Sequence, residues 1–76
     1  MSFVERPMSR IVRSVSDARR RCDKIRWMRS EAEAQRAAGE LLDDVLFSIN
    51  AGLCGPAHVL AGIAEEACQW ADHKVH

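Results

Sequence analysis

The feature that most constrains this chain is the spacing of apolar residues between positions 8 and 29. Five of them recur at intervals of four, three, four and three residues: Ile11, Val15, Ala18, Cys22 and Ile25. Such spacing forms one stripe along an α-helix, which packs against another helix. At about 100° per residue, five cations fall on roughly the opposite side: Arg10, Arg13, Arg20, Arg21 and Lys24. We therefore predict a helix with one packed face and one cationic face.

Two further helices are predicted downstream. The first stripe cannot continue, because the same spacing would place Arg29 and Arg36 on the packed face. Ser30 and Glu33 form a capping-box pattern, which predicts a new helix start. Gly52 suits a helix end and Pro56 a first helical position. The apolar residues in between make a second stripe, followed by a third after Pro56: Ala34, Ala38, Leu41, Val45 and Ile49, widened by Leu42 and Leu46, and then Leu60, Ile63, Ala67 and Trp70.

These patterns predict an all-α fold with helices at about 8–28, 31–50 and 56–73. Short connections favour antiparallel neighbours, either as a small three-helix bundle or as a helical hairpin plus a third helix. One domain is expected over residues 8–76, preceded by a flexible lead-in at 1–7. A chain of 76 residues buries only about 60% of its unfolded surface. We therefore expect a homodimer to complete the core.

The zero net charge conceals a division between the two parts of the chain. Residues 1–29 hold nine basic and three acidic residues, a net charge of +6, whereas residues 30–76 hold two basic and eight acidic residues, a net charge of −6. This asymmetry indicates a polyanionic partner, or charged parts that complement each other within the fold or across a dimer.

The cationic face of the first helix has three interpretations. It is a solvated face in which Asp17 and Asp23 pair with neighbouring arginines, or it contacts an acidic protein surface, or it contacts nucleic acid. The sequence pI of 6.8 and the absence of a recognised motif disfavour nucleic acid. Trp27 lies about 150° from the apolar stripe. It either packs beneath the second helix or the N-terminal arm, or is an exposed aromatic that anchors a protein partner or stacks on a base.

We interpret the chain as a small non-enzymatic protein-interaction or regulatory module that binds an acidic surface of another protein. Its mechanism would be steric: it would mask, bridge or hold the partner. The predicted alternative is a nucleic-acid-binding helical dimer that uses the same arginines on phosphates. A third interpretation is a structural subunit whose charged parts complement each other in an assembly. The predicted partner-binding residues are Arg10, Arg13, Arg20, Arg21, Lys24 and Trp27.

Other chemistries have little support in the sequence. No nucleophile–base arrangement or glycine-rich phosphate loop is present, so we expect neither enzymatic activity nor a cofactor. The spacings among Cys54, His58, Cys68 and His73 lack the tight pairs of structural zinc sites, and we expect no metal. An odd number of cysteines and no apolar leader or long apolar stretch predict reduced thiols in a cytoplasmic protein without membrane contact.

Overall fold

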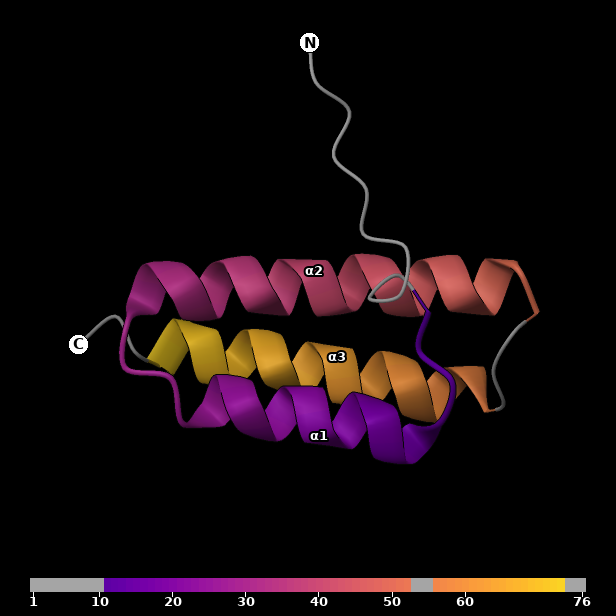
Figure 1. Ribbon diagram of the computed structural model, residues 1–76, viewed down its shortest axis with the longest axis horizontal. Coiled ribbons are helices and arrows are strands. Elements are labelled where there is room, and N and C mark those ends of the chain that lie inside the picture. Colours follow the sequence, from indigo (N-terminus) through magenta and orange to yellow (C-terminus); the bar gives the residue numbers. More distant parts are fainter. Residues whose placement is uncertain (1–10, 53–55, 74–76) are drawn as a thin grey trace, which may run out of the picture.

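The computed structural model describes residues 11–52 and 56–73, which form three helices (Figure 1). α1 spans Val15–Arg26, α2 spans Glu31–Asn50 and α3 spans Ala57–Asp72. α2 runs antiparallel to α1 and α3, and every pair of helices is in contact. The described residues contain no strand. The predicted all-α three-helix bundle is confirmed.

α1 begins about two turns later than the predicted start at residue 8. Positions 8–10 lie outside the described residues, and residues 11–14 are not helical. Ser14 is the N-cap, and its hydroxyl oxygen accepts a hydrogen bond from the backbone N–H of Asp17 at 3.1 Å. The Asp17 carboxylate accepts in turn from the backbone N–H of Arg13 at 3.3 Å. The cap at Ser14 and the Asp17 contact with the preceding residue fix the helix start at Val15, so the predicted start at residue 8 is wrong.

The segment before α1 packs into the bundle in a non-helical conformation. Val12 is fully buried, and its backbone N–H donates to the hydroxyl oxygen of Ser48 on α2 at 2.9 Å. Ile11, which the helical stripe placed in the core, is only half-buried. The different backbone conformation is the physical reason, because the helical period does not apply before Ser14.

The other helix boundaries follow the local capping signals. The Ser30 hydroxyl oxygen accepts from the backbone N–H of Glu33 at 3.3 Å, and α2 has the predicted bounds. Gly52 has a φ of +69°, a left-handed conformation that glycine adopts without steric cost, which supports its predicted role at the end of α2. α3 is one residue shorter at each end than predicted, with Pro56 as its N-cap.

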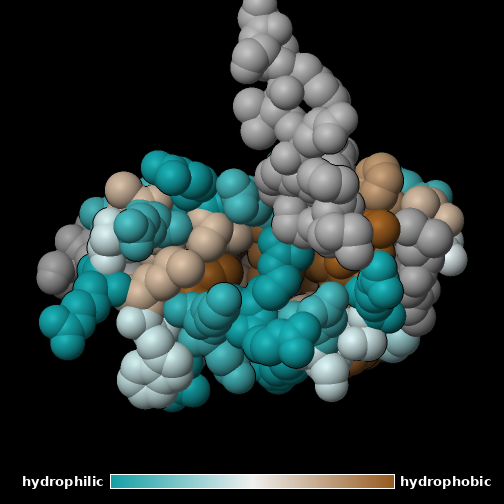
Figure 2. Space-filling model, viewed as in Figure 1, coloured by the Kyte–Doolittle hydropathy of each residue, from teal (hydrophilic) through white to brown (hydrophobic). Residues whose placement is uncertain are grey.

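The core between the helices is rich in small side chains. Alanine supplies six of the thirteen buried apolar residues in the described part of the chain, and these alanines let the helices approach closely. Larger buried side chains include those of Ile25, Leu41 and Leu60. Leu46, which we expected to widen the stripe of α2, lies at its edge and is 47% exposed. Figure 2 shows hydrophilic side chains along α1, with apolar side chains visible between the helices.

Candidate functional site

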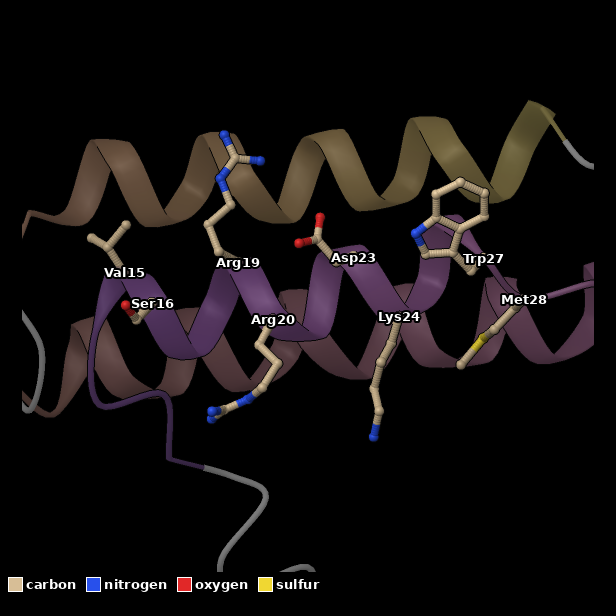
Figure 3. A pocket seen from close by; sticks show the side chains of 8 residues that line it. All are labelled: Val15, Ser16, Arg19, Arg20, Asp23, Lys24, Trp27 and Met28. Atoms are coloured by element: carbon tan, nitrogen blue, oxygen red, sulfur yellow. The ribbon is translucent and has the colours of Figure 1, made fainter.

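The candidate site is an open depression of about 730 Å³ on the side of α1 that faces away from the core (Figure 3). We call this surface the outer face of α1. Because it is wide open, it suits the surface of a macromolecule better than a small ligand, which is usually largely enclosed. Eight residues line it: Val15, Ser16, Arg19, Arg20, Asp23, Lys24, Trp27 and Met28.

These eight residues form two parallel rows along the helix. Residues four positions apart lie one above the other on a helix, which gives one row of Val15, Arg19 and Asp23 and another of Ser16, Arg20 and Lys24. Trp27, the C-cap residue of α1, continues the first row, and Met28, just beyond the helix, continues the second. In Figure 3, the Arg19 and Trp27 side chains extend toward the α3 side, whereas Arg20 and Lys24 extend the opposite way. The depression lies between these two rows.

Trp27 is the most exposed large apolar side chain of the described residues. Its side chain lies on the surface, and the residue is 75% exposed. The interpretation that it packs beneath the second helix is therefore wrong. Its backbone is nevertheless held at the end of α1, because its N–H donates to the Lys24 carbonyl oxygen at 3.2 Å. The Arg26 guanidinium carbon lies 5.2 Å from the centroid of the indole ring, within the range of a cation–π contact.

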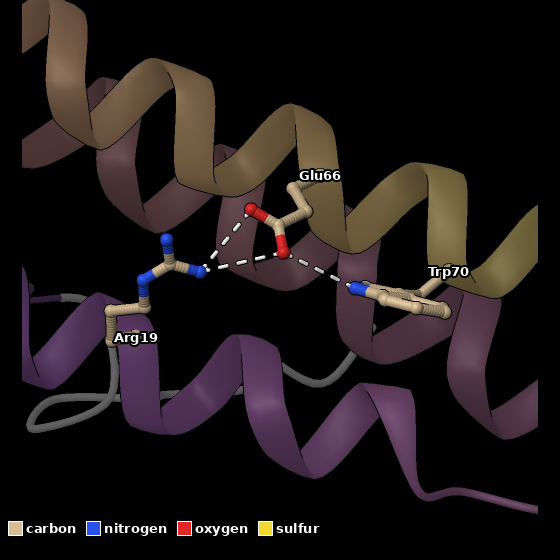
Figure 4. A network of polar contacts seen from close by, with 3 residues as sticks. All are labelled: Arg19, Glu66 and Trp70. Atoms are coloured by element: carbon tan, nitrogen blue, oxygen red, sulfur yellow. Dashed lines mark hydrogen bonds and ion pairs between the residues drawn. The ribbon is translucent and has the colours of Figure 1, made fainter.

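A polar network connects the row of the site nearest to α3 with α3 itself (Figure 4). Arg19 donates to both carboxylate oxygens of Glu66, at 3.2 and 3.4 Å, and Glu66 also accepts from the Trp70 indole N–H at 3.3 Å. The Arg26 guanidinium lies 4.7 Å from a Trp70 ring centroid. Two arginines of α1 therefore contact α3 and help to fix the helix that carries the site.

Arg21 does not belong to the exposed cationic face on which we placed it. Its Nη2 atom lies 2.9 Å from Oδ2 of Asp44 on α2, and the Asp44 side chain is only 1% exposed. Arg21 precedes Cys22, a core residue, and lies at the edge of the packed stripe, so its side chain faces α2. This ion pair removes Arg21 from the predicted binding set and gives it a role in packing α1 against α2.

The other predicted site residues have different positions. Arg20 and Lys24 line the outer face with Trp27, and Arg20 also forms an ion pair with Asp17 within the helix. Arg13 is exposed just before α1. Arg10 lies outside the described residues. The structure therefore brings three of the six predicted residues together and adds Arg19, Asp23 and Met28, among others, which the sequence analysis left out of the binding set.

The two described cysteines are free thiols in or near the core. Burial raises the pKa of the Cys22 thiol, with a further contribution from the Glu66 carboxylate. Burial also raises the pKa of the Cys68 thiol, to which Asp72 and Glu65 contribute. Among the described residues, no three histidine, cysteine or acidic side chains are grouped to hold a metal ion. Cys54, the remaining candidate ligand, lies outside the described residues.

Comparisons of the chain with protein-family models, with curated proteins and with solved structures found no match. In the described part of the chain, no helix combines the length and the apolar character needed to cross a membrane. The outer face of α1 is the surface from which we infer a function.

Proposed function

We propose that this protein is a non-enzymatic binding module that contacts an acidic surface of a partner protein through the outer face of α1. The observation that carries the proposal is the exposure of Trp27, at 75%, in the same depression as Lys24 and Arg20. Tryptophan and arginine are the residues most often found at the energetic centres of protein interfaces. A partner that covered the indole ring would bury a large apolar area close to charges that fix its orientation.

The charges of this face favour an acidic partner of limited charge density. The Lys24 ammonium group has no ion pair or hydrogen bond within the described residues, whereas the Arg19 and Arg20 side chains are paired with Glu66 and Asp17. These arginine pairs are exposed, and such pairs contribute little free energy in water. Carboxylates of a partner can therefore bind the same guanidinium groups at small cost.

Nucleic acid is the less favoured partner for the same face. Affinity for phosphates depends on the number of cations that neutralise them. Of the cations we expected to serve in this way, Arg21 instead pairs with Asp44, and the acidic Asp23 side chain also lines the depression. Both features weaken the case for a phosphate-binding helix.

Native mass spectrometry of the protein, purified gently from its own host, tests the proposal. We expect the wild-type chain to carry a bound protein and the Trp27→Ala variant to lack it. As an interface anchor, Trp27 should contribute enough that its replacement by alanine weakens binding at least about 30-fold. Leu46→Ala is the matched control, because Leu46 is also a large exposed apolar residue but lies on α2. It should retain the partner.

Three results would contradict the proposal. A partner retained equally by the Trp27 and Leu46 variants would place the binding surface elsewhere. Bound nucleic acid, with an affinity that falls steeply with salt, would favour the phosphate-binding alternative. Multiples of the 8.5 kDa chain mass alone would favour a structural subunit that associates only with itself.

A further inference from the structure

We propose that the outer face of α1 receives a single amphipathic, acidic α-helix of the partner protein. This inference rests on the proposed function and adds the shape and chemistry of the segment that binds. It follows from the arrangement of the rows, their length and the order of side chains along them.

The two rows of side chains form two ridges with a groove between them, and a partner helix can pack in this groove. Rows of side chains four residues apart are the ridges through which helices most often pack, with the ridge of one helix seated in the groove of the other. Here the Arg19–Asp23–Trp27 ridge and the Arg20–Lys24–Met28 ridge border one groove (Figure 3). A partner in an extended conformation binds by hydrogen bonds to unpaired backbone N–H and C=O groups. Within α1 these groups already bond to each other along the helix, so α1 does not suit an extended strand.

The length of the groove sets the length of the bound segment. The lining residues extend from Val15 to Met28, a span of 14 residues. At 1.5 Å per residue this corresponds to about 20 Å, or about four turns of a partner helix. A segment of this length is marginal as an isolated helix in water. We therefore expect the partner helix to belong to a folded domain or to form fully upon binding.

The order of side chains along the groove sets the chemistry of the occupant. Apolar residues stand at both ends: Val15 at one end and Trp27 and Met28 at the other, of which Val15 and Met28 also pack against the core. Between them, the cations Arg20 and Lys24 stand one helical turn apart in one row, and Arg19 and Asp23 stand in the other row, so three cations outnumber one carboxylate. The complementary segment has apolar side chains toward both ends and, between them, two carboxylates four residues apart, which lie about 5–6 Å from each other on a helix.

A second copy of this chain matches that pattern poorly. α3 contains no lysine or arginine and exposes Val59 and Glu65, but the residues four positions from Glu65, Ala61 and Gln69, carry no carboxylate. α2 exposes Leu46 and Asp43, but Arg36 is also exposed on α2 and would repel the cations of the groove. The charge and spacing of the exposed residues thus favour a different protein as the source of the helix.

Peptide binding to the full chain tests the inference. The probes are three helix-forming 14-residue peptides with leucines at both ends and a pair of glutamates, four residues apart, placed in three different registers. Each is compared with a scrambled peptide of the same composition and with a version that has a central proline. Fluorescence anisotropy of labelled peptides gives the dissociation constants. We expect at least one helical peptide to bind ten times or more tightly than its scrambled and proline versions.

The protein variants locate the peptide on the chain. Trp27→Ala and Lys24→Glu should each weaken binding of the best helical peptide at least tenfold, with unchanged helical circular dichroism. Arg36→Glu makes the same charge reversal as Lys24→Glu on α2, away from the groove, and should change the dissociation constant less than twofold.

Each contrary result has a distinct meaning. If the helical, scrambled and proline peptides bind equally and all depend on Trp27, the helical occupant is wrong but the acidic protein partner stands. If no peptide binding depends on Trp27 and Lys24, the helical occupant is wrong, and the native mass spectrometry decides the proposed function separately. Tighter binding of a 14-base-pair DNA duplex to the same residues would overturn both. Self-association abolished by Lys24→Glu would identify a second copy as the occupant and overturn this inference.

Discussion

Arg21 and Lys24 lie less than one helical turn apart on α1 and border one depression beside α2, yet their burial and their partners differ. Arg21 is mostly buried and forms an ion pair with Asp44, whose side chain is 1% exposed. Lys24 is exposed on the outer face next to Trp27. A cation at the edge of the packed stripe helps to hold two helices together, whereas a cation beyond that edge remains available to a partner. The number of arginines in α1 therefore overstates the charge that a partner meets.

The same contrast explains part of the charge asymmetry of the chain. Ion pairs join the basic segment to the acidic segment within the described part of the bundle: Arg21–Asp44 at the α1–α2 contact, and the exposed Arg19–Glu66 pair between α1 and α3. The complementarity expected as one alternative from the sequence is thus present within the fold. It is partial, because the outer face of α1 still presents Lys24.

Removal of the buried ion pair should have the largest effect on stability. Arg21→Leu removes the ion-pair partner of the buried Asp44 side chain, and loss of one partner of a buried pair costs about 3 kcal/mol of unfolding free energy. Urea unfolding followed by circular dichroism measures this change. Lys24→Leu, the same substitution on the exposed side, should alter the unfolding free energy by less than about 0.5 kcal/mol. Equal losses in the two variants would contradict the distinction between the two sides of α1.

The cap of α1 should have the next largest effect. Ser14→Ala removes the side-chain oxygen that accepts from the Asp17 N–H, which should lower the unfolding free energy by about 1 kcal/mol. The same urea unfolding experiment measures it. Ser16→Ala is the control, because Ser16 lies on the outer face one residue inside the helix and caps nothing. A larger loss for Ser16 than for Ser14 would refute the observed helix start.

The ion pair between α1 and α3 should contribute less. Glu66→Ala removes the acceptor for both Arg19 and Trp70, but the side chains of Arg19 and Glu66 are 51% and 41% exposed, so solvent screens the pair. We expect a loss of about 0.5–1 kcal/mol in thermal or urea unfolding. Glu65→Ala, at the adjacent exposed position, should cause a smaller loss, and the reverse order would argue against the network.

Trp27 should matter least for stability and most for binding. Trp27→Ala removes a 75% exposed side chain, so the unfolding free energy should change by less than about 0.5 kcal/mol. Trp70→Ala is the comparison on α3, where the indole is half-buried and donates to Glu66. That substitution should cost about 2 kcal/mol or more. A Trp27 variant as unstable as the Trp70 variant would show that Trp27 supports the fold.

Much of the fold could be predicted because its signals are local. The bounds of α2 follow from the Ser30 cap and the end at Gly52, and its stripe identifies Ala34, Ala38 and Leu41 as core residues. The start of α1 was also encoded locally, in the pair of Ser14 and Asp17. Pro7, which suits a helix that begins just beyond it, instead favours the earlier start at residue 8.

The candidate site could be predicted only in part because it depends on how the helices rotate against each other. The helical wheel of α1 places Trp27 away from the apolar stripe. It does not say whether another segment covers the Trp27 side chain, so exposure was one of the alternatives. The partner of Arg21 is set by the rotation of α2. One signal was available, because Asp44 lies on the same side of α2 as Leu41 and Ser48, which are buried. A carboxylate in that position indicates a buried cation as its partner.

The most direct test of the central claim is a map of where the partner binds. Once the partner is captured, backbone amide and indole N–H chemical shifts of the isotopically labelled chain can be followed as the partner is added. We predict the largest changes at Ser16, Arg20, Lys24 and the Trp27 indole, along the outer face of α1. Larger changes on α2 and α3, at Asp43 or Glu65 for example, would show that the partner binds a different face and would contradict the account.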